Sequence, residues 1–217
     1  MGEPEGAAPV PDAAPGYPLK RALDVVVSLT ALTLVLPVLL AVAAAIKWDS
    51  PGPVLYRGLR VGQAGRRFRI LKFRTMVADR EREGPAVTAS DDPRVTRVGG
   101  WLRRTRLDEL PQLVNVLRGQ MSVVGPRPEA PEFVARRPDL FRRLLRARPG
   151  LMDLATLSYL PKEEALGHSA EVERRYVEEV MPGKLALSER YLATQSLSQD
   201  VRTMLLAARA LLSRWRR

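Results

Sequence analysis

VVVSLTALTLVLPVLLAVAAAI, residues 25–46, is a run of 22 residues that contains no charged side chain. At a rise of about 1.5 Å per residue, a helix of this length measures roughly 33 Å and covers the hydrocarbon core of a bilayer. Both ends carry the aromatic and basic residues typical of membrane interfaces: Tyr17, Lys20, Arg21, Lys47 and Trp48. The stretch therefore predicts a membrane-embedded helix over residues 19–48, in preference to the buried helix of a soluble core.

Pro37 lies near the middle of this run and removes a backbone hydrogen bond, so we expect a kink near Val35 or Leu36. A straight helix would cross the bilayer, whereas a bent, re-entrant helix would return to the face from which it came. Basic residues at both ends favour the re-entrant form, because lysine and arginine prefer the cytoplasmic side. The basic remainder of the chain is expected on the cytoplasmic side in either case.

The composition suits a folded protein with a phosphate-bearing partner. The chain has 217 residues, 46% of them apolar, and a net charge of +11 carried mostly by arginine. Such a charge fits nucleic acid, anionic lipid or a nucleotide, although a genome-wide arginine bias explains part of it equally well. The lack of cysteine excludes disulfides and thiolate chemistry. Residues 1–18 are rich in Pro, Ala and Gly and predict a disordered tail, not a signal peptide.

Short apolar runs after the membrane segment predict a β-hairpin. Strands are expected at residues 54–56 and 68–73, around a glycine-containing turn at 62–65. Their alternation places Arg67 and Arg69 on one edge, with Lys72 or Arg74 as its next member. By charge alone, a basic edge of this kind faces anionic lipid at least as readily as it serves an active site.

WLRRTRLDELPQLVNVLRGQMSVVGPRP, residues 101–128, concentrates the charged chemistry of the chain. A helix is expected over residues 95–106, and a second, amphipathic helix begins at Asp108 and Glu109. Asp108 is a good N-cap, and both carboxylates would lie near the positive end of the helix dipole, where phosphate also binds. Taken alone, capping explains the pair better than catalysis does.

The remaining segments give simpler expectations. Residues 79–94 predict a loop, residues 131–146 a basic helix, and residues 170–180 a helix that is broken at 181–183. His168 is expected on a surface loop, because no carboxylate stands at a ligand spacing from it. Residues 200–217 form an amphipathic pattern, and an interfacial membrane helix and a core-packed helix explain this pattern equally well.

Several long stretches resemble the bacterial sugar transferase family, the small monotopic polyprenyl-phosphate phosphoglycosyl transferases. The resemblance extends over about residues 18–212. The matching stretches are KRALD (20–24), the Pro-kinked apolar run, SPGPVLY (50–56), GRRFRILKFRTM (65–76), DDPRVTRVGGWLRRTRLDELPQLVNVLRG (91–119), MSVVGPRP (121–128), ARPG (147–150) and YVEEVMPGKLALSERYL (176–192).

The resemblance implies a helix-dominated α+β fold in a monotopic membrane protein. A Pro-kinked re-entrant helix and a small hairpin would lead into a compact cytoplasmic catalytic domain over residues 49–199, with interfacial amphipathic helices that include residues 200–217. The implied reaction transfers a sugar-1-phosphate from a nucleotide diphosphate sugar to undecaprenyl phosphate. It takes place at the cytoplasmic face of the bacterial inner membrane and starts the synthesis of a surface polysaccharide or glycoconjugate.

The resemblance also assigns roles to site residues. Asp108 is implied as the nucleophile that forms a covalent aspartyl phospho-sugar, and Glu109 completes the dyad. Both would hold Mg2+, which neutralises the diphosphate. Phosphate binding would fall to four basic residues: Lys72, Arg103, Arg127 and Arg148. These roles agree with general chemistry, because carboxylates act as covalent nucleophiles and phosphoryl transfer needs cations.

Three positions depart from the family pattern. Leu36 precedes Pro37 where many members carry Ser, and Gln120 replaces the usual acidic residue before MS. Met152, Asp153, Leu154 and Ala155 replace the common Thr-Gly-Trp-Ala, which suggests a different sugar or nucleotide preference. Two other functions stay open: a non-catalytic, membrane-tethered basic protein that binds nucleic acid or anionic lipid, and an inactive scaffold. The favoured function involves membrane lipids and no nucleic acid.

Overall fold

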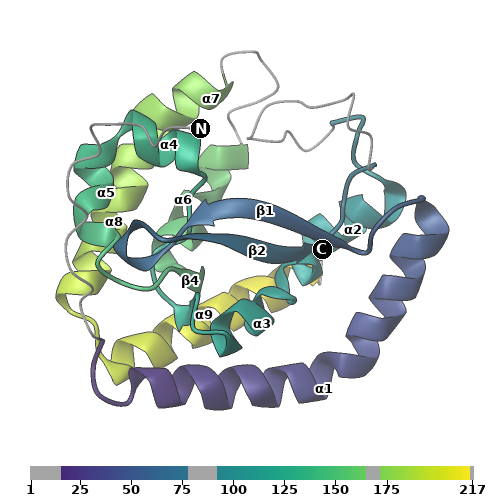
Figure 1. Ribbon diagram of the computed structural model, residues 1–217, viewed down its shortest axis with the longest axis horizontal. Coiled ribbons are helices and arrows are strands. Elements are labelled where there is room, and N and C mark those ends of the chain that lie inside the picture. Colours follow the sequence, from purple (N-terminus) through teal and green to yellow (C-terminus); the bar gives the residue numbers. More distant parts are fainter. Residues whose placement is uncertain (1–15, 78–91, 165–171, 216–217) are drawn as a thin grey trace.

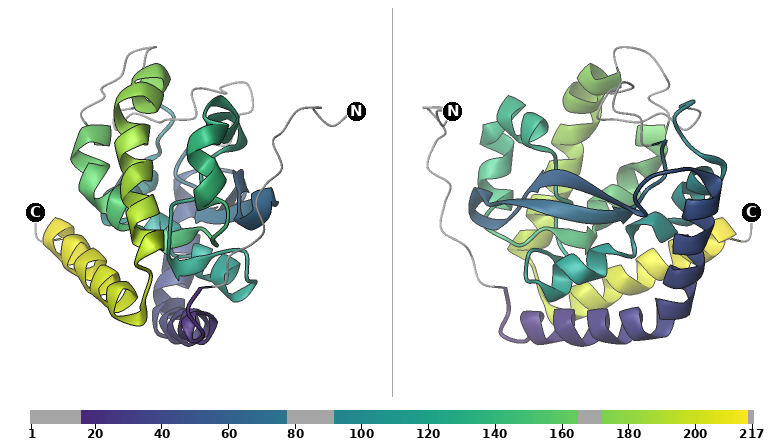
Figure 2. Two further views of the ribbon diagram at one scale, coloured as in Figure 1. Left: turned by 90° about the vertical axis from the view of Figure 1, so that its left-hand side faces the viewer. Right: turned by 45° about the vertical axis from the view of Figure 1, so that its right-hand side comes forward.

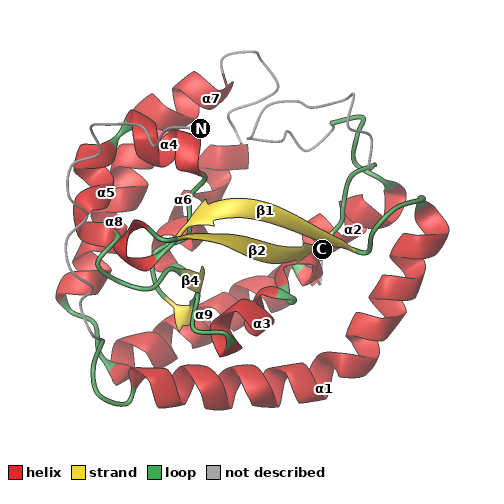
Figure 3. Cartoon of the chain, viewed as in Figure 1, coloured by secondary structure: helices red, strands yellow, loops and turns green. Residues whose placement is uncertain are grey.

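Helices dominate the structure, a computed structural model that describes residues 16–77, 92–164 and 172–215 (Figures 1 and 3). The predicted disordered tail and the predicted loop at 79–94 fall mostly outside these residues, and His168 falls outside them altogether. The main elements are α1 (Lys20–Asp49), β1 (Leu55–Val61), β2 (Arg67–Phe73), α2 (Arg97–Thr105), α3 (Gln112–Leu117), β3 (Ser122–Val124), α4 (Pro131–Arg136), α5 (Pro138–Leu144), β4 (Gly150–Met152), α6 (Leu154–Glu164), α7 (Val172–Arg175), α8 (Met181–Ala193) and α9 (Leu197–Trp215). This architecture confirms that the fold is α+β and helix-dominated, with a long apolar N-terminal helix and small sheets.

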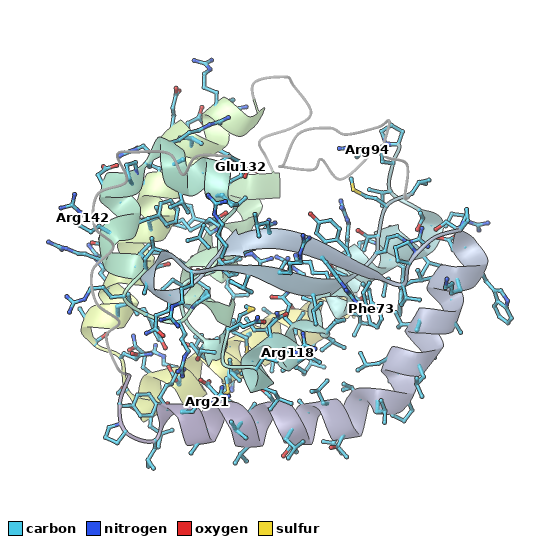
Figure 4. All side chains as sticks on the ribbon, in the orientation of Figure 1. Arg21, Phe73, Arg94, Arg118, Glu132 and Arg142 are labelled. Atoms are coloured by element: carbon cyan, nitrogen blue, oxygen red, sulfur yellow. The ribbon has the colours of Figure 1, made fainter. Side chains whose placement is uncertain are left out.

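The helix α1 is long and apolar enough to cross a membrane. Its residues are arranged in the reverse of a soluble helix: Lys20, Asp24 and Ser28 are buried on one face, whereas large apolar side chains point outward. Leu34, for example, is 74% exposed, and Figure 4 shows side chains along the outer edge of α1 that point away from the rest of the protein. Polar groups inward and apolar groups outward suit a helix whose surroundings are lipid.

The helix bends sharply between its two halves, as Figure 1 shows. Pro37 lies inside the helix, where it cannot donate to the carbonyl four residues earlier. Thr33 adds a second cause, since its hydroxyl donates to the carbonyl of Leu29 at 2.9 Å, a contact that bends helices. After the bend, Val42 and Ile46 pack with Phe73 and Leu102, so both halves of α1 contact the remainder of the fold.

A buried polar network fastens the start of α1 to the centre of the protein. The ammonium of Lys20 donates to the carboxylate of Asp200 and, at 2.9 Å, to the carbonyl of Val124. Asp24 accepts from the hydroxyl of Ser122 and the main-chain N–H of Val123, both at 2.9 Å. The motif KRALD thus joins α1 to β3 and α9.

Arg21 completes the attachment of α1. Its guanidinium donates to the carbonyls of Val116 and Leu117 at 2.7 and 2.9 Å, and Figure 4 places it beside α3. These two carbonyls belong to the last turn of α3, where carbonyl groups lack donors within the helix. The carbonyl of Val116 also accepts from the main-chain N–H of Gly119 at 2.9 Å. The first turns of α1 therefore complete the C-terminus of the helix that follows the carboxylate pair.

The strands β1 and β2 form the predicted antiparallel hairpin, and β1 is longer than expected. Phe68 and Ile70 point from one face into a core with Val116, Val123 and Tyr191. The prediction that Lys72 continues the edge of Arg67 and Arg69 is wrong. Alternation along β2 places Lys72 on the face of Phe68 and Ile70 instead.

A second sheet consists of two short parallel strands, β3 and β4. Behind it, α4, α5 and α8 share an apolar core that includes Phe133, Phe141 and Leu185. Two expectations are corrected here. The basic helix over 131–146 is split in two at Arg137, because Pro138 begins a new helix. The break expected at 181–183 does not occur, since a π-helical turn, Tyr176–Val180, leads directly into α8.

The C-terminal helix α9 begins beside the start of α1 and then diverges from it (Figure 2). Its buried face is formed by Asp200, Thr203 and Ala207, whereas Val201 and Leu205 are exposed. A core-packed amphipathic helix would bury its leucines and expose its polar side chains. The orientation of α9 therefore favours the interfacial alternative that its sequence pattern left open.

Candidate active site

Asp108 and Glu109 lie in a single 3-10 turn, Leu107–Glu109, between α2 and α3. Arg106 precedes the turn with a left-handed backbone, φ 60°, which is strained for a residue other than glycine. The prediction that Asp108 caps the following helix is wrong, because α3 begins after Pro111 and has no side-chain cap. The two carboxylates are thus presented by a short strained turn, where a capping role does not account for them.

Three cationic side chains surround the carboxylate of Glu109. Its Oε1 lies 3.1 Å from the ammonium of Lys72 and 3.1 Å from the guanidinium of Arg106. Arg127 donates to both carboxylate oxygens, which is the bidentate geometry of the strongest charged hydrogen bonds. Burial opposes ionisation of Glu109, but Arg127, Lys72 and Arg106 together hold its pKa well below the usual range. Glu109 is therefore ionised, and its carboxylate contacts Lys72, Arg106 and Arg127.

Asp108 has a different environment, although it is the next residue in the chain. Its side chain is 7% exposed, and within the described residues its Oδ1 has no hydrogen-bond partner. Burial raises the pKa of Asp108, and the charge of Glu109 adds to this rise, against the opposing effect of the three cations. A buried oxygen without a partner costs free energy in the folded protein, and a ligand that engaged this oxygen would remove the cost.

The positions of Lys72 and Arg127 follow from contacts behind the site. Asn115 of α3 accepts from the main-chain N–H of Leu71 and donates to the carbonyl of Arg69, both at 2.9 Å, which fixes the end of β2 that carries Lys72. Arg127 follows β3 within the segment Gly125-Pro126-Arg127-Pro128. Gly125 and Gly150 approach so closely that a Cβ on Gly150 would lie 2.1 Å from the nitrogen of Gly125.

The other residues predicted for the site are placed less directly. The Nε of Arg103 donates to Thr75 at 2.9 Å, and burial lowers the pKa of Arg103 while the charge of Asp108 opposes this change, so Arg103 and Asp108 interact electrostatically. Arg148 precedes β4, beside Gly125. Among the described residues its side chain makes no hydrogen bond or ion pair with the dyad. The structure thus brings Lys72 and Arg127 to Glu109, whereas a phosphate-binding role for Arg148 stays a prediction.

Two of the positions that depart from the family pattern lie directly behind the site. Gln120 accepts from the amide of Asn115 at 2.7 Å, so an amide here completes the support of β2. Asp153 is buried and accepts from the main-chain N–H of Arg127 and of Ala155 and from the hydroxyl of Thr156. Burial raises the pKa of Asp153. This carboxylate therefore contacts the backbone of the segment that carries Arg127.

Sequence reasoning missed Arg106, Asn115 and the support role of Asp153. The sequence does contain a signal for Arg106. It stands three residues before Glu109, and side chains at this spacing lie close together on a helical turn. No comparable signal marks Asn115, whose backbone partners Leu71 and Arg69 lie 44 and 46 residues away in the sequence. None marks the contact of Asp153 with the backbone of Arg127 either.

The site suits a magnesium ion that arrives with a phosphate ligand. No cluster of three or more Asp, Glu, His or Cys occurs in the described parts of the chain, but Mg2+ commonly takes only one or two carboxylates, with substrate phosphates and water filling its other positions. The unpartnered Oδ1 of Asp108 fits this requirement. Glu109 fits it less well, because its oxygens already accept from Lys72, Arg106 and Arg127.

Comparison with known proteins agrees with the geometry. The chain is 42% identical over 211 residues to the UDP-glucose:undecaprenyl-phosphate glucose-1-phosphate transferase of Caulobacter vibrioides, covering 92% of this chain and 74% of that protein. It is 54% identical over 110 residues to the exopolysaccharide production protein PSS of Rhizobium leguminosarum, covering 50% of this chain and 55% of the relative. It is also 50% identical over 112 residues to the UDP-glucose:undecaprenyl-phosphate glucose-1-phosphate transferase of Escherichia coli, covering 52% of this chain.

The chain spans less than two thirds of the length of several relatives, and its match covers 24% of the Escherichia coli protein. The profile of one family, described as bacterial sugar transferase, matches residues 16–214. This match includes both halves of α1, the hairpin, the carboxylate turn and most of α9. The chain belongs to the bacterial sugar transferase family.

Proposed function

We propose that this protein transfers a sugar-1-phosphate from a UDP-sugar to undecaprenyl phosphate and so initiates polysaccharide synthesis. The observation that carries the proposal is the pair of unlike carboxylates: Asp108 is buried with an unpartnered oxygen, and Glu109 holds three cations beside it. The donor and the acceptor are those named for the Caulobacter and Escherichia relatives. An anionic diphosphate would be attracted to the cations and would place its phosphorus near Asp108.

The reaction would proceed in two displacements. An oxygen of the Asp108 carboxylate attacks the phosphorus bonded to the sugar, and the bond between this phosphorus and the oxygen of UMP breaks, with its electron pair leaving on UMP. An oxygen of undecaprenyl phosphate then attacks the same phosphorus and releases the carboxylate. Lys72, Arg106 and Arg127 stabilise the negative charge on the phosphate oxygens, and Arg103 lies where it can assist.

We propose Asp108 as the principal protein ligand of Mg2+, with Glu109 reaching the ion only if it exchanges one of its cationic partners. When bound, Mg2+ supplies Lewis-acid neutralisation of the diphosphate. The carboxylates keep their separate tasks: Asp108 attacks, and Glu109 holds Lys72, Arg106 and Arg127 in place.

The function is tested with the full chain purified in detergent. Each UDP-sugar of a panel is supplied with or without undecaprenyl phosphate, and UMP release is measured with Mg2+ or with EDTA. We expect sustained turnover for at least one donor only when acceptor and Mg2+ are both present, and a single stoichiometric burst of UMP without acceptor. Salt-sensitive DNA binding together with no UMP release from any donor would contradict the proposal and favour a non-catalytic basic protein.

The pH dependence of the first displacement is expected to report on Asp108. Because its pKa is raised, the nucleophile becomes protonated at a pH above the ordinary aspartate value of about 3.9, and the rate falls as the pH drops through this raised pKa. Glu109→Gln removes the negative neighbour, which lowers the pKa of Asp108 and moves the acidic limb to lower pH. The measurement is the rate of the UMP burst without acceptor, so that the acceptor phosphate does not contribute a titration.

Glu132→Gln is the control for this experiment. This substitution removes the same charge as Glu109→Gln, but from an exposed position on α4 (Figure 4). It should leave the acidic limb in place. An acidic limb that stays fixed or moves to higher pH in Glu109→Gln would contradict the assignment of Asp108 as the titrating nucleophile.

We also propose that the protein is monotopic in the bacterial inner membrane, with both ends of α1 on the cytoplasmic side. Support comes from the bend in α1, the outward apolar side chains, and the contacts of Lys20 and Ile46, from opposite ends of α1, with one domain. A cysteine introduced at Gly16, with no other cysteine in the chain, should resist a membrane-impermeant thiol reagent in intact cells and react after permeabilisation. Labelling in intact cells would show that α1 crosses the membrane.

A further inference from the structure

Tyr56 lies on the face of the hairpin that serves the active site. In the antiparallel register it stands directly opposite Lys72, and residues opposite each other in such a pair project from the same face with Cβ atoms about 5 Å apart. Lys72 reaches from this face to Glu109, 3.1 Å away. Tyr56 is therefore a close neighbour of the cations that would bind the diphosphate, and the proposed mechanism gives it no role.

The side chain of Tyr56 extends along the hairpin toward Gly58, the next residue of β1 on this face. A Cβ built on Gly58 would lie 2.7 to 3.0 Å from the Cε1, Oη and Cζ atoms of Tyr56, so the hydroxyl end of the ring occupies the space that a side chain at Gly58 would fill. Only a residue without a side chain leaves room for this position. The hydroxyl end of the ring thus lies against this glycine, and half of the side chain stays exposed.

The outward side of Tyr56 is available to a ligand. The side chain is 51% exposed, and within the described residues its hydroxyl takes part in no hydrogen bond. Its neighbours on this face are Lys72, whose ammonium contacts Glu109, Gly58, which has no side chain, and Ile70, which is apolar. A sugar ring placed here would find donors in Lys72 alone among these neighbours, whereas the flat face of a nucleobase needs none.

We propose that Tyr56 is a stacking platform for the pyrimidine base of the nucleotide donor. The inference rests on the proposed function, since it assumes that a nucleoside diphosphate sugar binds at Asp108 and Glu109. In this arrangement the diphosphate lies at Lys72, Arg106 and Arg127, and the base of the leaving UMP lies on Tyr56. Contacts of this kind discriminate little among pyrimidines, because every base has a π-face.

The experiment measures binding of two probes to the full-length protein in detergent: UMP, and ribose 5-phosphate, which lacks the base. Tyr56→Ala is expected to raise the Kd of UMP by about tenfold or more and to leave the Kd of ribose 5-phosphate unchanged. Tyr56→Phe should keep the affinity for UMP, whereas Tyr56→Leu, which retains apolar surface without an aromatic ring, should lose it. Trp48→Ala removes an exposed aromatic side chain elsewhere and should change neither Kd.

An unchanged Kd of UMP in Tyr56→Ala would overturn the inference, as would an equal loss for both probes. Weaker binding of the UDP-sugar with unchanged binding of UMP would also overturn it, and would place the sugar on Tyr56. Formation of the aspartyl adduct at saturating UDP-sugar is measured in the same preparations. If the unsubstituted protein forms the adduct but Tyr56→Ala binds UMP unchanged, the stacking role of Tyr56 is contradicted and the proposed function is not. If the unsubstituted protein forms no adduct, the proposed function itself is contradicted.

Discussion

Asp108→Ala is expected to lower turnover by roughly 10⁴-fold or more, the scale on which removal of a catalytic nucleophile acts. The physical reason is specific to this position. Asp108 offers a buried oxygen without a partner, beside three cations that would hold the substrate phosphates. The substituted protein should form no covalent adduct from a radiolabelled UDP-sugar, whereas the original protein should form one that survives denaturation.

Two controls separate chemistry from folding in this experiment. Asp139→Ala removes an exposed aspartate from α5 and should leave turnover unchanged. UMP should still bind to Asp108→Ala, because Lys72, Arg106 and Arg127 remain on Glu109. Normal turnover in Asp108→Ala would show that another residue, or direct attack by the acceptor, performs the transfer.

Lys20→Ala is expected to destabilise the folded protein by about 3–5 kcal/mol, the cost of leaving buried charge without its partner. The ammonium of Lys20 is buried between Asp24 and Asp200, both fully enclosed. Its loss leaves two carboxylates close together and removes one donor from the carbonyl of Val124, which also accepts from the hydroxyls of Ser122 and Tyr191. The expected result is a large drop in the thermal midpoint of the protein in detergent micelles.

Lys47→Ala provides the matched control, since this lysine belongs to the same helix but is exposed and makes one contact, to the carbonyl of Gly52. It should shift the midpoint only slightly. Combining Lys20→Ala with Asp200→Asn should restore part of the loss, because one unpaired charge is removed. A midpoint in Lys20→Ala equal to that of Lys47→Ala would show that the polar network contributes little to stability.

The hairpin and the apolar helix can be predicted from the sequence because their signals are local. Turn residues between two alternating runs determine β1 and β2, and a run without charges determines α1. The parallel pair of β3 and β4 has no such signal. Each strand has three residues, the alternation of burial is absent from β3, and the partner lies beyond two helices. The position of Arg127 depends on this pair, so it follows from the family resemblance and not from the pattern of residues.

The turn that carries Asp108 and Glu109 is a second feature that local sequence signals do not predict correctly. A helix start at Asp108 is a sound expectation from N-cap preference, but Pro111 moves the start of α3 to Gln112. The pair then lies in a 3-10 turn set by the left-handed backbone of Arg106. Sequence pattern indicates which residues carry charge here, whereas the difference between Asp108 and Glu109 arises from contacts with Lys72 and Arg127 that only the tertiary structure supplies.

The buried polar residues and exposed apolar residues of α1 determine how a detergent-free version of the protein could be made. Cutting the chain after this helix would remove Lys20, Arg21 and Asp24 from contacts with β3, α3 and α9, so the truncated product would lose part of its own interior. A water-soluble version should instead keep the helix and carry charged residues in place of its exposed leucines, such as Leu29, Leu34 and Leu40. The inward polar stripe would then hold the enzyme together in water.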